Sequence, residues 1–194
     1  MTIPPGFLAL REEASTTLSA WHASSAEQHG LRERYVAHLA EEPAGCWRDG
    51  PPIHLTAGVL LLDAAGEHAL LTLHPKVGLW LQLGGHLEAD DSSLRDAALR
   101  EGTEESGIDG IVISADPIDL HAHPLGGNFT RCTEHLDVRY AGWAPPGASP
   151  VRSDESDDLA WWPVDDLPTK TDPDLSNLVA AARACPRPNT PRST

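Results

Sequence analysis

The feature that most constrains the fold is a near-continuous apolar run, HLTAGVLLL, at residues 54–62. Turn-forming residues follow at positions 63–67, and a second apolar run occupies residues 69–73. Short apolar runs that are bounded by turn residues are typical of buried strands. We therefore predict two strands of a buried sheet in this part of the chain.

The periodicity elsewhere adds helices and further strands. Apolar residues recur at helical spacing over residues 10–21 and 31–39, and Ser25 and Gln28 have the spacing of a capping box before the second segment. A polar helix is predicted over residues 92–106, with Gly107 as its C-cap, and a closing helix over residues 175–184. Further strands are predicted at residues 79–83, 111–120, 135–143 and 159–162, which together make a mixed α/β fold.

The charge balance restricts the kind of ligand. The chain of 194 residues has 14 Lys and Arg against 29 Asp and Glu, a formal net charge of -15. A field of that sign repels a phosphate backbone, so a nucleic-acid duplex is a disfavoured partner. A phosphate-containing ligand would need a local cation, and a divalent metal held by clustered carboxylates is the obvious source.

Location is predicted from what the sequence lacks. No apolar stretch approaches the roughly 18 residues of a membrane-spanning helix, and neither a secretory nor a mitochondrial leader is visible at the N-terminus. Three cysteines, Cys46, Cys132 and Cys185, are odd in number and far apart, so we interpret them as reduced thiols. We expect a soluble, cytoplasmic protein that does not bind membranes.

The segment GGHLEADDSSLRDAALREGTEESGI at residues 84–108 carries the chemistry. At about 100° per residue, the three glutamates of its helix, Glu101, Glu104 and Glu105, share an arc of about 100°. Like charges one turn apart each disfavour a helix by roughly 0.2–0.5 kcal/mol, and hard oxygen ligands at this spacing suit Mg²⁺ or Mn²⁺. A solvated acidic face is the alternative, but Leu94 and Ala97 continue the same face and indicate buried structure beside the carboxylates.

This segment resembles the Nudix box. The box pattern is Gly, five residues, Glu, seven residues, Arg-Glu, an aliphatic residue, any residue, Glu-Glu, any residue, Gly and an aliphatic residue, and residues 100–108 match its second half in register. Gly85 matches the opening glycine if one extra residue is accepted. Two positions depart from the pattern. The middle Glu is absent, which leaves Asp91 as the candidate partner of Arg100, and Gly102 replaces the aliphatic residue, at a cost of roughly 0.5–1 kcal/mol to the helix.

The resemblance extends over residues 53–184. The approach WLQLGGH is similar to a Nudix subgroup that has GGH where others have GGK or GGR, and ESDDLAWWPVDDLP resembles the last strand and closing segment of the family. The resemblance implies an α/β/α sandwich around a mixed β-sheet. We accordingly predict a helical N-terminal extension at residues 1–50, a Nudix hydrolase domain at 51–185 and a flexible, proline-rich tail at 186–194.

For function, the resemblance implies a metal-dependent pyrophosphohydrolase that cleaves a nucleoside diphosphate linked to another moiety, X, by attack of water on the diphosphate. Glu101, Glu104 and Glu105 would bind Mg²⁺ or Mn²⁺, with the Gly85 carbonyl as a further ligand. Arg100 would orient a glutamate through a charge-assisted hydrogen bond. The expected partner is a small-molecule diphosphate, and a homodimer contact is one of three roles open to the N-terminal helices, beside covering the sheet and shaping the pocket.

Several assignments stay open at this stage. The general base is either a box glutamate, Glu104, or a distal one, for which Glu155 comes before Glu134, although acidic loops such as residues 154–158 are commonly only solvated. Gly84 and Gly85 are expected to bind substrate, because glycines allow the backbone to approach a ligand closely, and His86 is expected either to bind substrate or to be structural. The histidines at positions 121, 123 and 135 are expected to be hydrogen-bonded residues rather than a second metal site, because no spacing connects them.

Two other functions are compatible with the same fold. One is a catalytically inactive ligand-binding module, which the three retained glutamates disfavour. The other is a prenyl-diphosphate isomerase, for which Cys132 would be the pocket cysteine. Neither the identity of X nor the preferred nucleotide follows from the sequence.

Overall fold

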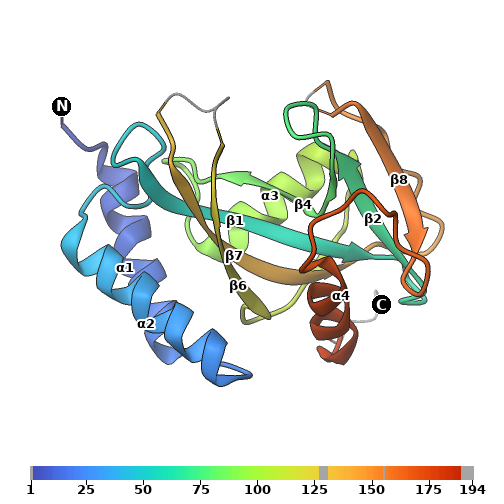
Figure 1. Cartoon of the computed structure of the whole chain (residues 1–194), viewed down its shortest axis with the longest axis horizontal. Helices are drawn as coiled ribbons and strands as arrows, with labels where there is room; N and C mark the ends of the chain where they lie inside the picture. The colour runs from blue at the N-terminus through green and yellow to red at the C-terminus, as the bar shows by residue number, and fades with distance from the viewer. Residues whose placement is uncertain (1, 127–130, 155, 189–194) are drawn as a thin grey trace, which may run out of the picture.

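A mixed sheet forms the centre of the fold (Figure 1). The computed structural model describes residues 2–126, 131–154 and 156–188, and within them the sheet has eight strands. The strands are β1 (Ile53–Leu62), β2 (His68–Leu73), β3 (Trp80–Leu81), β4 (Leu83–His86), β5 (Val112–Ile113), β6 (Asp119–Pro124), β7 (Glu134–Trp143) and β8 (Asp158–Pro163). The helices are α1 (Pro5–Ala20), α2 (Ala26–Glu41), α3 (Leu94–Ser106) and α4 (Leu175–Ala184).

The two longest strands, β1 and β7, are parallel and pair over their whole length. Each has two shorter strands along its other edge. On β1, β4 pairs with residues 56–59 and β2 with Leu61 and Leu62, whereas on β7 the partners are β6 and β5. All pairings other than β1–β7 are antiparallel, so the sheet is mixed, as predicted.

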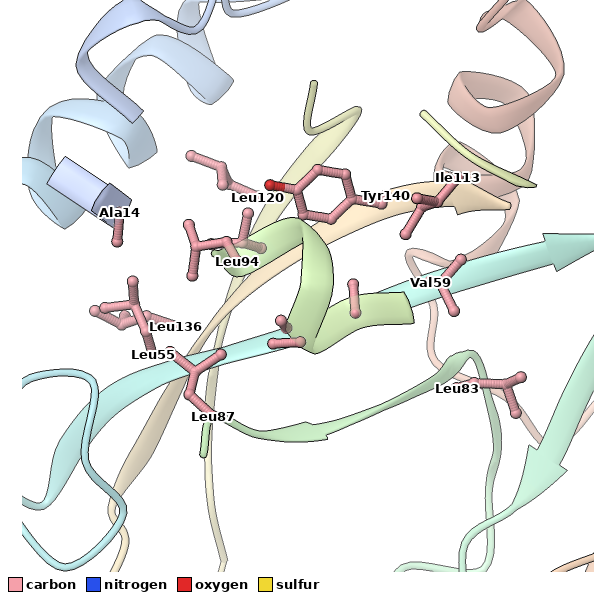
Figure 2. Close-up of a cluster of buried hydrophobic side chains, with 14 of the residues drawn as sticks. Ala14, Leu55, Val59, Leu83, Leu87, Leu94, Ile113, Leu120, Leu136 and Tyr140 are labelled. Carbon is pink, nitrogen blue, oxygen red and sulfur yellow. The ribbon is translucent and has the colours of Figure 1, made fainter. Parts of the chain in front are cut away.

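Alternate residues of β1 face two different layers. Leu55, Val59 and Leu61 belong to a core that also contains buried side chains of α1, α2 and α3, while Leu60 and Leu62 pack in a second cluster with residues of α4. Figure 2 shows the first cluster, with α3 lying across β1. Because α3 and α4 cover opposite faces, the architecture is the predicted α/β/α sandwich.

The N-terminal helices cover part of the first face. Their buried residues Leu10, Ala14 and Leu18 share a core cluster with Leu55 of β1 and Leu136 of β7. The sequence left three roles open for these helices, and the contacts observed here are those of a sheet cover. No described helix combines the length and the apolar character that crossing a bilayer requires.

Several element bounds agree with the sequence prediction. Ser25 caps α2 by accepting a hydrogen bond from the Gln28 N–H at 3.1 Å, and α4 spans the predicted residues. The Gln28 side chain does not complete the capping box but reaches the Asp119 carboxylate at 2.8 Å. The predicted strand at 111–120 is wrong as a continuous element, because it divides into β5 and β6 around Pro117, which has no N–H to donate. The predicted strand at 79–83 likewise divides into β3 and β4.

Candidate active site

Helix α3 carries the three glutamates of interest, and both of its ends are fixed locally. Ser93 precedes the helix and accepts a hydrogen bond from the Asp96 N–H at 3.0 Å. Gly107 ends it with a φ of 64°, a left-handed conformation that favours glycine. The Arg95 side chain also donates to the Ser114 carbonyl at 2.9 Å, so the first turn is attached to the sheet side of the fold.

Strand β4 pairs with β1 and lies against α3, and its two glycines permit close approach on both sides. A Cβ atom on Gly84 would lie 2.6 Å from the Gly58 Cα, and one on Gly85 would lie 2.7 Å from the Glu101 Oε1. Neither position can hold a side chain without movement of its neighbours. The Glu101 carboxylate therefore rests directly against the backbone of Gly85.

The other two carboxylates of the helix differ in their surroundings. The Gly84 N–H donates a hydrogen bond to Glu105 Oε2 at 3.1 Å, so Glu105 is also connected to the glycine pair. The Glu104 side chain is 60% exposed, whereas Glu101 is buried. Of the three, Glu104 is thus the most exposed, whereas Glu105 is half-buried.

Arg100 connects the components of this group. Its guanidinium donates two hydrogen bonds to Asp91, from Nε at 2.9 Å and from Nη2 at 3.0 Å, and Nη2 also donates to the His86 carbonyl at 3.0 Å. Nη1 contacts Glu101 at 3.0 Å and Glu104 at 3.1 Å. Asp91 is thus the partner of Arg100, the role for which the sequence made it the candidate because the middle Glu of the box is absent. Although burial alone lowers the pKa of Arg100, Asp91 and Glu101 raise it above its ordinary value.

The site has more negative than positive charge. Four carboxylates lie within 4.0 Å of the Arg100 guanidinium, an excess of three negative charges among five groups, and they belong to Glu88, Asp91, Glu101 and Glu104. Glu105 adds a further carboxylate on the same helix. Mg²⁺ and Mn²⁺ prefer oxygen ligands such as these carboxylates, whose negative charge exceeds the positive charge nearby. The residues present therefore fit a hard divalent metal.

The second departure from the box pattern also has a physical reason. A Cβ on Gly102 would lie 2.7 Å from the Val59 Cγ1, and a Cβ on Gly142 of β7 would lie 2.6 Å from the Val59 Cγ2. Each methyl group of Val59 therefore occupies space beside a glycine. The expectation that Gly102 only weakens the helix was incomplete, because the glycine lets α3 pack closely on β1.

The structure describes only one of the two distal candidates for the general base. Glu155 lies outside the described residues. Glu134 forms an ion pair with Arg34 of α2, in which Arg34 Nη1 and Glu134 Oε1 are 3.0 Å apart. It lies opposite Ile53, four residues and about 13 Å along β1 from the residue that pairs with Gly85. Glu134 is therefore not part of the carboxylate group.

His86 contributes to that group through its backbone alone. Because successive side chains of a strand point to opposite faces, its imidazole lies on the other side of β4 from Glu101. There its ring centroid is 5.2 Å from that of His54 and 5.0 Å from that of His135. Burial lowers the pKa of His86 to about 3 and that of His135 to about 4, so both rings are neutral at physiological pH.

His123 and His135 differ from the expectation of ordinary hydrogen-bonded residues, whereas His121 accepts a hydrogen bond, as expected. Within the described residues, buried ring nitrogens without a hydrogen-bond partner occur in His38 of α2 and in four histidines of the sheet, His54, His86, His123 and His135. The sequence offered no spacing that connects the sheet histidines, since four different strands supply them. Only the register of the sheet, in which His54 lies opposite His135, brings them together.

A buried charge network lies further along the same face. Arg139 is 2% exposed and forms ion pairs with Asp119 at 3.4 Å, Asp174 at 3.3 Å and Asp137 at 3.7 Å. It also donates to the His121 Nδ1 at 2.7 Å. Because three carboxylates share one guanidinium, Asp119 is poorly compensated, and burial raises its pKa to about 6.

Comparisons with known proteins agree with this architecture. The NUDIX domain family matches residues 52–182. Among solved structures, the chain is similar to an Ap4A hydrolase of C. elegans (18% identity, 67% of this chain and 95% of that chain, TM-score 0.54). It is also similar to RenU, a Nudix hydrolase of M. smegmatis (20%, 71% and 90%, 0.52), and to the dihydroneopterin triphosphate pyrophosphohydrolase of E. coli (16%, 69% and 94%, 0.52). At these identities the likeness is one of fold. No curated protein matches the chain significantly in sequence.

Proposed function

Because this chain belongs to the Nudix family of hydrolases, which act on phosphoric anhydride bonds, we propose that it is a divalent-metal-dependent pyrophosphohydrolase. Its proposed substrate is a nucleoside diphosphate linked to another moiety, and the attacking group is water. The observation that carries the proposal is the convergence of Glu101 and Glu105 on the glycine pair of β4, with Arg100 beside them.

The metal-binding residues follow from the donor set. The carboxylates of Glu101, Glu104 and Glu105 and the carbonyl of Gly85 would hold Mg²⁺ or Mn²⁺. A divalent ion bound there offsets the charge of the diphosphate oxygens and favours ionisation of the attacking water.

Arg100 and Glu104 have separate roles in this proposal. Arg100, held by Asp91 and the His86 carbonyl, orients the carboxylates of Glu101 and Glu104. Glu104 accepts the proton of the attacking water, since its side chain is the exposed one of the three. Glu155 is the distal candidate for the same role.

The fold by itself does not select the organic group that is attached to the diphosphate, so the substrate must be identified by experiment. The three similar structures carry names that refer to a dinucleoside polyphosphate, to a pterin triphosphate or only to the family, so the shared fold accommodates different organic groups. A panel of nucleoside triphosphates, dinucleoside polyphosphates, ADP-ribose and nucleotide sugars, each with Mg²⁺ or Mn²⁺, identifies the moiety.

The decisive variant is Glu104→Gln. Because general-base catalysis contributes about 10²–10⁴-fold, we expect release of phosphate or nucleotide to fall at least about 100-fold, with the unfolding midpoint unchanged. Glu12→Gln is the matched control, since Glu12 is an exposed glutamate of α1. Full activity of the Glu104→Gln variant with saturating Mg²⁺ would refute the proposal. Binding of Mn²⁺ with no turnover of any panel member would favour the ligand-binding module instead.

A further inference from the structure

Three imidazoles meet on the face of the sheet that is opposite to the carboxylates. His54 of β1 lies opposite His135 of β7, and His86 of β4 lies opposite Thr56, two residues along β1. All three side chains therefore project from the same face of three adjacent strands. Their ring centroids are 5.0, 5.1 and 5.2 Å apart, which makes an almost equilateral triangle.

One ring nitrogen of each histidine has no hydrogen-bond partner among the residues that the structure describes. The Nε2 atoms of His54, His86 and His135 are all buried, and none has a hydrogen bond to any part of the chain that the structure describes. Leaving a buried polar atom without a partner destabilises the folded state. Three such atoms in one place indicate that something other than the groups of the described residues occupies the space between them.

The tautomer of His54 specifies the kind of occupant. Its Nδ1 lies 3.1 Å from the Pro51 carbonyl, which can only accept a hydrogen bond, so Nδ1 carries the proton. In the neutral ring, Nε2 then presents its lone pair, and His54 is fully buried. A histidine whose other nitrogen donates to a backbone carbonyl is the usual arrangement of a metal ligand.

A cysteine completes the set of donors. One ligand atom from each of His54, His86, Cys132 and His135 lies within 4.8 Å of the others. Zinc bonds of about 2.0–2.1 Å to nitrogen and 2.3 Å to sulfur correspond to ligand separations of about 3.3–3.6 Å in a tetrahedron. The four side chains would therefore need to contract by little more than about 1 Å.

We propose that His54, His86, Cys132 and His135 form a zinc site that shares no ligand with the carboxylate site. Imidazole and thiolate donors select Zn²⁺ over Mg²⁺, which prefers oxygen. Four protein ligands close the coordination sphere, as in structural zinc sites, so the ion would tie β1, β4 and the segment before β7 together.

A neighbouring group of candidate donors does not support a second ion. It consists of His121, His123 and Asp137. His121 already accepts a hydrogen bond from Arg139, and Asp137 lies 3.7 Å from the same guanidinium. The Arg139 guanidinium is thus already paired with the carboxylate that a metal ion would need as a ligand.

The test uses the full chain, stripped with a chelator, dialysed and titrated with Zn²⁺ or with Co²⁺ as a spectroscopic probe. We expect one equivalent of tight zinc, a raised unfolding temperature with Zn²⁺ but not with Mg²⁺, and a Co²⁺ spectrum with tetrahedral visible bands and a thiolate charge-transfer band. Cys132→Ser should abolish that band and weaken zinc binding at least about 100-fold, because it removes a direct ligand. Cys185→Ser, at the end of α4, is the matched control and should change neither.

A histidine variant provides a second, independent measurement. His86→Gln should remove tight zinc binding, whereas His22→Gln, at an exposed histidine, should retain it. Since His54 is fully buried and its variants can fail to fold, the half-buried Cys132 keeps the test decisive. Absence of zinc binding by the wild type, which would leave ordered water as the occupant, would overturn the proposal. So would zinc binding that survives in Cys132→Ser and His86→Gln but is lost in Glu104→Gln.

Discussion

Replacing Gly102 with alanine tests how α3 is held against the sheet. In a helix interior, alanine is favoured over glycine by roughly 0.5–1 kcal/mol. At this position, however, the new Cβ would lie 2.7 Å from the Val59 Cγ1, well inside the roughly 3.5–4.0 Å of an ordinary carbon contact. Overpacking of a core typically costs about 1–3 kcal/mol. We therefore expect Gly102→Ala to lower the free energy of unfolding by about 1–2 kcal/mol.

The chain supplies its own matched control. Gly30 lies inside α2, and a Cβ built there meets nothing within 4 Å. Gly30→Ala should therefore show the propensity gain alone, a stabilisation of roughly 0.5–1 kcal/mol. The same substitution in two helices thus has opposite predicted signs.

A double variant isolates the contact. Val59→Ala removes two buried methyl groups at roughly 0.8 kcal/mol each, plus a cavity term. In Val59→Ala/Gly102→Ala the new Cβ takes the vacated space, so we expect a coupling of at least about 1 kcal/mol in favour of the pair. Guanidinium denaturation followed by far-ultraviolet circular dichroism measures all four proteins. Additive effects, or a Gly102→Ala variant as stable as Gly30→Ala, would refute the reasoning, because α3 would then move away from β1 without cost.

Two further predictions concern charged groups. Asp91→Asn should lower kcat about 10–100-fold, with KM changed far less, because Arg100 loses its two hydrogen bonds to the Asp91 carboxylate. The control is Asp90→Asn, at an exposed residue, which should match the wild type. Equal kcat in both variants would contradict this role of Asp91. The pKa of Asp119 is about 6 in the folded protein, above its ordinary 3.8, so the folded state holds this proton more tightly. Relative to Asp119→Asn, the wild type should lose up to about 3 kcal/mol of stability between about pH 4 and pH 6, and guanidinium denaturation that gives a constant difference over this range would exclude it.

The elements that the sequence predicted well have strong local signals. The apolar run of β1 and the periodic positions of α4 decide their structure within a few residues of chain. The extra strand β4 has no such signal, since two of its four residues are glycines, which weaken strands. Its formation depends on pairing with β1, a contact between segments that local propensity does not describe.

In the candidate sites, too, the sequence predicted what depends on local spacing but not what depends on contacts between distant segments. Helical spacing alone predicted that Glu101, Glu104 and Glu105 share a face, but it gave no information on which of them would be buried. The burial of Glu101 comes from Gly85, sixteen residues earlier in the chain. His54 and His135 are still further apart, and the register that aligns them is fixed by the whole length of the β1–β7 pairing.

The consecutive residues Gly85 and His86 connect the two sites mechanically. On one face of β4 the absence of a side chain at Gly85 admits the Glu101 carboxylate, and on the other face the His86 ring joins the imidazole triangle. The His86 carbonyl also accepts a hydrogen bond from Arg100 at 3.0 Å. Under the zinc proposal, an ion that fixes the His86 ring restricts the backbone that carries this carbonyl. The proposed metal on the histidine face would therefore help to hold Arg100 in position for the carboxylates, without contacting the substrate.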